Sequence, residues 1–282
     1  MSVRAALAAN YDLHRLQQLL KWIVYSLLIV NWGFYIAEDW ARALHTLGPG
    51  SSPLDWAREF ATSIDEAGWF ILLFMFELET YILADEQWKR RVARTVHLVR
   101  LACYVMILHT VYAYAVTVLE YQPTIVVENA TNLCDFADTE VSYVYNLEYT
   151  EVDAENCANL SDATEFYKVG ADPVVATRAG LALERRLALG DLVEATAWLI
   201  IVIAIELVVR LQEREVTGGR LISSLNRVKL FCYLLLIGLS VWWATLSHWL
   251  YTWDEFLWIA GFAAIEMNIS EWRDEIEEEQ SS

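Results

Sequence analysis

Long apolar stretches alternate with shorter polar segments along the chain, and six of the stretches approach the length that crosses a bilayer. A helix needs about 20 mainly apolar residues to span the hydrocarbon core. The six predicted spans are Trp22 to Ala37, Ala67 to Ala84, Leu101 to Leu119, Leu192 to Val209, Leu230 to Ser247 and Phe256 to Ile269. The third and fifth contain no Asp, Glu, Lys or Arg, whereas Glu interrupts the second, fourth and sixth. The pattern predicts an all-α polytopic membrane protein with six transmembrane helices.

The long polar connection between the third and fourth predicted spans is expected to form a small folded cap. Within it, Val141, Tyr143, Tyr145, Leu147 and Tyr149 alternate with other residues, which is typical of a strand. The Ala/Leu-rich stretch from Val174 to Leu189 is expected to be an amphipathic surface helix before the fourth span. The predicted organisation is residues 1–119 for the first hairpin plus the third helix, 120–190 for the acidic cap, 191–270 for helices four to six and 271–282 for an acidic tail.

Composition agrees with a membrane protein and places most of the charge in two segments. Of the 282 residues, 56% are hydrophobic, and 38 Asp and Glu against 20 Lys and Arg give a formal net charge of -18. Residues 120–191 carry 14 acids and four bases, and residues 271–282 carry six acids and one base. This acidic balance argues against binding to nucleic acid, because contact with phosphate needs a basic surface.

The distribution of Lys and Arg predicts the topology, since cytoplasmic connections carry an excess of both. The N-terminal segment and the second and fourth connections are the basic ones; the second holds Lys89, Arg90, Arg91, Arg94 and Arg100. The cap therefore faces outward, both termini are cytoplasmic, and the protein belongs in the cell inner membrane. The first apolar run lacks a small-residue cleavage site, so we expect it to act as an uncleaved anchor.

Two of the four cysteines fall in the cap, on the side predicted to be oxidising. A disulfide between Cys134 and Cys157 is expected there. A metal role is weaker because the cap has no histidine and no Cys-x-x-Cys spacing. We therefore predict a disulfide, no metal site and no cofactor.

A repeated pattern suggests that the helices form three related hairpins. Spans one, three and five begin with an aliphatic residue, a cation, three apolar residues and a tyrosine, in Leu20 to Tyr25, Val99 to Tyr104 and Val228 to Tyr233. In the even-numbered spans a Trp precedes a Glu by eight residues, in the pairs Trp69 and Glu77, Trp198 and Glu206, and Trp258 and Glu266. We interpret these matches as three copies of a two-helix hairpin, over residues 16–86, 95–215 and 224–275.

The three repeated glutamates are the candidate functional residues, because an acid inside a membrane must be neutral, paired or in contact with water. In the first hypothesis Glu77, Glu206 and Glu266 line the bundle interior and pass or carry a small cation or protons. Acids at the starts of the even helices would form an outer vestibule that concentrates cations: Asp65, Glu66, Asp191, Glu194, Asp254 and Glu255.

The alternative hypothesis is a non-transporting structural or sensory subunit in which the glutamates are packing latches. Their predicted partners are tyrosines and cations of neighbouring helices and of the same helix: Lys21, Tyr25, Arg100, Tyr104, Lys229, Tyr233 and Arg210. Glu206 and Arg210 are four residues apart, a spacing that lets them meet on one helical face. In this hypothesis the cap and the tail bind a protein partner or a second copy of the chain.

Other polar residues in the predicted spans carry weaker signals. Asn31 is expected to hydrogen-bond a neighbouring helix, and His109 to be a satisfied packing residue. The chain contains no His-Glu-x-x-His, Gly-x-Ser-x-Gly, Walker or Gly-x-Gly-x-x-Gly pattern. We therefore expect the protein not to be an enzyme.

Overall fold

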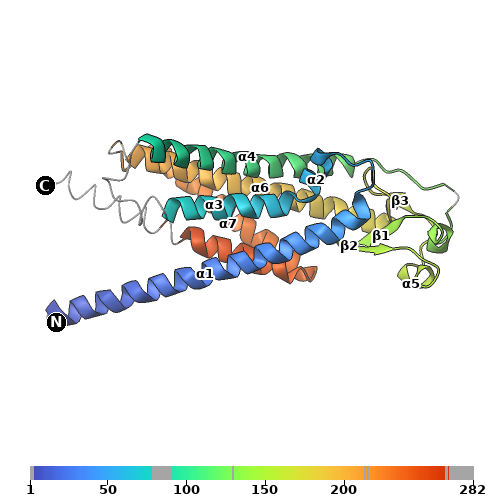
Figure 1. Ribbon diagram of the computed structural model, residues 1–282, viewed down its shortest axis with the longest axis horizontal. Coiled ribbons are helices and arrows are strands. Elements are labelled where there is room, and N and C mark those ends of the chain that lie inside the picture. Colours follow the sequence, from blue (N-terminus) through green and yellow to red (C-terminus); the bar gives the residue numbers. More distant parts are fainter. Residues whose placement is uncertain are drawn as a thin grey trace. The chain divides into compact units, whose positions relative to one another are not determined.

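The computed structural model describes residues 3–77, 90–128, 130–212, 214, 216–263 and 266. Most of these residues are helical (Figure 1). The long helices are α1 (Val3–Thr46), α3 (Ala61–Glu77), α4 (Arg90–Glu120), α6 (Arg178–Gln212) and α7 (Arg220–Thr245), with the short α2 (Pro53–Glu59) between α1 and α3. Residues 249–263 are also helical.

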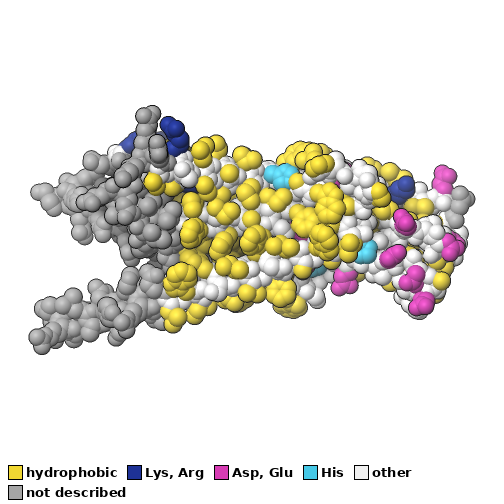
Figure 2. Space-filling model, in the orientation of Figure 1, with side chains coloured by type: hydrophobic (Ala, Val, Ile, Leu, Met, Phe, Trp, Pro, Cys, Tyr) yellow, Lys and Arg dark blue, Asp and Glu magenta, His cyan; other side chains and the backbone are white. Residues whose placement is uncertain are grey.

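Three helices of the described chain, not six, are long and apolar enough to cross a membrane. They are Arg94–Glu120, Arg178–Gln212 and Arg220–Thr245, which contain the third and fourth predicted spans and all but the last two residues of the fifth. These helices support an integral membrane protein. Hydrophobic side chains also dominate the visible helical surface in Figure 2, while acidic side chains gather over the cap.

The other three predicted spans are not among these helices, and parts of two of them lie outside the described residues. The first lies in α1, where an apolar run that includes Asn31 ends at Glu38 and Asp39. The second lies in α3, which has 17 residues, and residues 78–84 of that span lie outside the described chain. Of the sixth, residues 264, 265 and 267–269 lie outside it as well. The prediction of six spans was therefore correct only in part.

Helix α6 corrects another prediction, because the expected surface helix before the fourth span is not separate from it. The chain is helical without interruption from Arg178 to Gln212. No proline stands in this stretch, and Gly190 in its interior is tolerated at a cost of about 1 kcal/mol. The fourth span therefore extends directly into the cap as one helix.

The chain divides into two compact units. One consists of Met1–Phe34 with Ile201–Ser282, and the other of Tyr35–Ile200. These boundaries cut through α1 and α6 and do not follow the predicted hairpin repeats. Nothing in the described ranges supports the triplication, which stays a prediction from the sequence.

The cap contains a four-stranded mixed sheet in the order β2-β1-β4-β3. Strands β1 (Ser142–Tyr145) and β2 (Glu148–Glu151) are antiparallel, β1 and β4 (Val174–Ala176) are parallel, and β3 (Tyr167–Lys168) is antiparallel to β4. The single strand expected from Val141 to Tyr149 is thus a hairpin. Its two-residue turn has positive φ at Asn146 (58°) and Leu147 (64°), the conformation of a type I′ turn.

The predicted disulfide between Cys134 and Cys157 is confirmed. It joins the 3-10 helix η3 (Leu133–Phe136) to the short α5 (Cys157–Leu160), with 4.8 Å between the two Cα atoms. Around it lie buried apolar residues of the cap, among them Phe136, Phe166 and Val175. The cap therefore has its own small core, which the disulfide closes.

In the Tyr35–Ile200 unit, α3 packs along α4 (Figure 1). The buried Gly68 makes the close approach possible, because a Cβ at this position would lie 3.3 Å from the Cβ of Met106. Trp69 of α3 also makes an edge-to-face contact with Trp198 of α6, with ring centroids 6.2 Å apart. These contacts fix the helix ends that carry the polar site described next.

Candidate functional site: a polar network and cavity beside the cap

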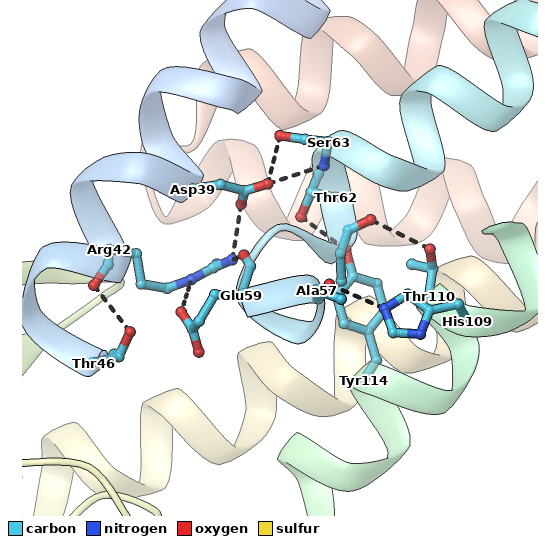
Figure 3. A network of polar contacts seen from close by, with 11 residues as sticks. Asp39, Arg42, Thr46, Ala57, Glu59, Thr62, Ser63, His109, Thr110 and Tyr114 are labelled. Atoms are coloured by element: carbon cyan, nitrogen blue, oxygen red, sulfur yellow. Dashed lines mark hydrogen bonds and ion pairs between the residues drawn. The ribbon is translucent and has the colours of Figure 1, made fainter. Parts of the chain in front are cut away.

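Arg42 near the end of α1 is the centre of a polar network (Figure 3). Its Nη2 lies 2.8 Å from Asp39 Oδ1, and its Nε lies 3.1 Å from Glu59 Oε2 in α2. Asp39, which is 2% exposed, also accepts hydrogen bonds from the backbone N–H and hydroxyl of Ser63 in α3. One arginine and one buried aspartate therefore join α1, α2 and α3.

The short helix α2 is placed by strong local signals. Ser52 and Asp55 form a capping box, and Pro53 occupies the first turn, where its missing N–H costs nothing. The carbonyl of Glu59 at the end of α2 accepts a second hydrogen bond from Arg42 at 2.5 Å. A cation at a helix C-terminus is favourable, so Arg42 contacts both the carboxylate and the backbone of Glu59.

Helix α4 joins the network through its own polar residues (Figure 3). His109 Nε2 lies 3.0 Å from the carbonyl oxygen of Ala57, and Thr110 donates to the carbonyl of Ala61. The hydroxyl of Tyr114 lies 3.0 Å from that of Thr62. His109 is thus a packing residue with a backbone partner, as the sequence analysis expected.

A cavity of about 280 Å³ lies within the Tyr35–Ile200 unit, beside this network. The ends of α1 and α4, α2, the β1–β2 turn, residues 171–172 and the cap end of α6 form its walls. Its charged lining residues are two arginines and six acids: Arg42, Arg58, Asp55, Glu59, Glu120, Asp172, Glu184 and Asp191. Acidic groups therefore predominate in the wall.

The arginines of the cavity are already bound to some of these acids. Arg42 binds Glu59 as described, and Arg58 Nη2 lies 2.5 Å from Glu120 Oε2. Burial, together with the negative charges of Glu59 and Glu120, raises the pKa of Asp172 to about 7. Acids thus outnumber arginines in the cavity wall, by six to two.

The six acids predicted to form one outer vestibule occupy several different environments. Asp191 lines the cavity, and Asp65 accepts a hydrogen bond from the indole N–H of Trp69 at 3.1 Å. Glu66, Asp254 and Glu255 are buried, and Glu194 is partly buried. These six acids therefore differ in burial and in their partners, and a shared vestibule stays a prediction from the sequence.

Two of the three repeated glutamates are bound to cations within the unit that contains α7. Glu266 Oε2 lies 2.5 Å from Lys229 Nζ, and Glu206 Oε1 lies 2.5 Å from Arg210 Nη2 one turn along α6. The side chain of Glu77 lies outside the described residues. Both described glutamates are therefore ion-paired with residues that the latch hypothesis named.

The remaining predicted latch partners occupy varied places. Tyr233 lies one turn from Lys229 on α7, within electrostatic reach of Glu266. The ring of Tyr25 contacts that of Trp22, at 6.3 Å between centroids. Arg100 and Tyr104 are partly buried on α4. The side chain of Lys21 is outside the described part of the chain.

A further buried contact joins residues far apart in sequence. The side-chain amide of Asn31 donates a 2.7 Å hydrogen bond to Asp254, and both side chains are buried. The sequence indicated that Asn31 would bond a neighbouring helix, but its partner was assigned to the vestibule instead. Asp254 is therefore a bonding partner of α1.

Most residues that line the cavity were not predicted from the sequence to be functional. Asp39 and Arg42 are three residues apart at the end of an apolar run, a spacing that could have indicated a helical ion pair. Glu184 stands alone in an Ala/Leu-rich helix, which could have indicated a buried acid. Asp172 gave no such signal because its neighbours come from distant segments.

Known proteins supply no assignment for this site. Comparison with protein-family models, curated proteins and solved structures gives no match to the chain. Among the described residues, no group of three or more His, Cys, Asp or Glu side chains is placed to hold a metal ion. Function is therefore argued from the chemistry of the chain itself.

Proposed function

We propose that this protein is a non-transporting sensory subunit of the inner membrane, with its cap outside, both termini in the cytoplasm, and its intramembrane glutamates serving as ion-pair latches. The contact between Lys229 and Glu266 carries this proposal. Lys229 is 4% exposed, and its ammonium forms an ion pair with the carboxylate of Glu266 on a separate helical segment. A carboxylate held by a buried ammonium is unsuited to binding and releasing a passing cation, because each passage would leave the lysine uncompensated.

The polar network beside the cap supports the sensory half of the proposal. Helix α6 extends from the membrane into the cap, Arg42 ties α1 to α2, and Asp39 ties α1 to α3. His45 Nδ1 of α1 also lies 2.8 Å from the hydroxyl oxygen of Ser142 in β1, so the cap contacts the helix that carries Arg42. A change in the cap would then pass to a partner through the cap, the acidic tail or a second copy of the chain.

Flux through the purified protein tests this function directly. Proteoliposomes with the wild-type chain should show the same K⁺ and H⁺ flux as protein-free liposomes. An imposed membrane potential drives the flux, and a pH-sensitive dye reports it. The triple variant Glu77→Gln, Glu206→Gln and Glu266→Gln serves as the comparison. Wild-type flux above the protein-free level would overturn the proposal, and loss of that flux in the triple variant would favour the glutamate pathway.

A further inference from the structure

The cavity beside the cap contains a buried carboxylate oxygen that has no partner. Glu184 is 1% exposed and lines the cavity. Its Oε1 accepts a 3.2 Å hydrogen bond from the backbone N–H of Leu147, whereas Oε2 receives none from any described atom. Buried acceptors are almost always satisfied, so the vacant side of this carboxylate points to a donor supplied by a ligand.

Two further acids share the same wall without a direct cationic partner. In the described structure neither Asp172 nor Asp191 accepts a hydrogen bond from Arg42 or Arg58, which are bound to Asp39, Glu59 and Glu120. Like charges in a partly desolvated cavity repel one another, and an added positive charge relieves that repulsion. The three acids together therefore favour a cationic guest.

The size and lining of the cavity select the kind of cation. A volume of about 280 Å³ is several times the roughly 30 Å³ that one water molecule occupies, and more than a bare ion needs. Tyr114, Tyr121 and Tyr149 also line it, and aromatic rings attract ammonium groups. An ammonium group can donate to Glu184 while its carbon chain contacts the tyrosine rings.

We propose that this cavity binds a protonated aliphatic amine, with an ammonium group donating to Glu184 Oε2 and further positive charge facing Asp172 and Asp191. The binding site gives the proposed sensory subunit its ligand. The amine site is also separate from the proposed ion-pair latches, because it lies wholly within residues Tyr35–Ile200. Failure of amine binding would leave the flux result intact, and transport would leave the amine site intact.

Binding of butane-1,4-diamine to the full-length protein in nanodiscs, measured by calorimetry, tests the proposal. Butane-1,4-diol is the uncharged control of the same length. We expect saturable binding of the diamine and at least tenfold weaker binding of the diol. Equal binding of the two compounds, or no binding of the diamine, would overturn the proposal.

Variants then locate the site. Asp172→Asn and Glu184→Gln should each weaken diamine binding at least tenfold, whereas Glu148→Gln, at an exposed acid of β2, should leave it unchanged. If Glu184→Gln does not fold, diamine binding by Asp172→Asn still tests the site. Equal weakening by Glu148→Gln would indicate general attraction to an acidic surface and overturn the site. Displacement of the diamine by an equal concentration of Mg²⁺ or glycine would overturn the ligand class.

Discussion

The ammonium of Lys229 in α7 lies 2.5 Å from the carboxylate of Glu266, 37 residues further along the chain. The lysine is almost wholly buried, while a quarter of the glutamate side chain is exposed. The pair thus connects α7 to the following helical segment through a charge that has little access to water. The contribution of the pair to the free energy of unfolding depends on that burial.

Removing one member of this pair should destabilise the protein strongly. Glu266→Gln leaves Lys229 buried without a counter-charge, and we expect a loss of about 3 kcal/mol in the free energy of unfolding. The double variant Lys229→Met with Glu266→Leu should recover most of that loss. Urea unfolding in detergent, followed by tryptophan fluorescence, measures both.

The Glu206–Arg210 pair is the matched control, because Arg210 is largely exposed. Both residues of this pair lie on α6, so Glu206→Gln breaks no contact between helices and should destabilise the protein less than Glu266→Gln. Equal losses of unfolding free energy for Glu206→Gln and Glu266→Gln would contradict the view that the burial of Lys229 makes its pair with Glu266 important for stability.

Gly68 should be intolerant of a larger side chain. A Cβ there would already lie 3.3 Å from Met106 Cβ and 3.4 Å from the carbonyl oxygen of Cys103. Gly68→Val should therefore separate α3 from α4 and cost roughly 1–3 kcal/mol in thermal-unfolding measurements. Gly238→Val in α7 is the control, because a Cβ there meets nothing within 4 Å. A stability of Gly68→Val matching that of Gly238→Val would show that this close approach is not needed.

Sequence patterns were sufficient where one segment carried the whole signal. Charge-free apolar runs identified α4 and α7, and the placement of two cysteines in one polar segment identified their disulfide. The β1–β2 hairpin was missed because its turn is Asn146-Leu147, without the glycine that usually follows asparagine in such turns. A two-residue turn also keeps the alternation that a continuous strand would show.

The candidate site could not be assembled from sequence because six separate segments build it. Arg42, Arg58, Glu120, Asp172 and Glu184 belong to different elements or loops, and no local spacing relates them. The repeated glutamates did give a local signal. Their periodicity fixed their place on a helix but not the identity of the residue facing them.

The Cys134–Cys157 bond should stabilise the cap. Closing a loop of this length restricts the unfolded chain and contributes about 3 kcal/mol. The double variant Cys134→Ser with Cys157→Ser should therefore expose the cap to limited proteolysis at protease concentrations that spare the wild type. Reducing agent should make the wild type equally sensitive and leave the variant unchanged. Equal resistance of the variant and the oxidised wild type would contradict this role.

Asp172 should make stability depend on pH in a defined direction. Its pKa in the folded protein is about 7, above the ordinary value of 3.8, because of burial and the negative charges of Glu59 and Glu120. A raised folded-state pKa means that this group's contribution is fully present below about pH 4 and is lost as the pH rises through about 7. Asp55 adds to the shift and Arg58 opposes it, while Glu184, Asp191 and Arg42 complete the charged wall.

Asp172→Asn keeps this position neutral at every pH and so isolates the effect. The difference in melting temperature between Asp172→Asn and the wild type should become more positive from pH 5 to pH 8, measured without added amine. Asp138→Asn, at an exposed acid of the cap, is the control and should show no such trend. A difference for Asp172→Asn that stays constant between the two pH values would mean that Asp172 is ionised throughout. In that case its charge would already be balanced within the cavity.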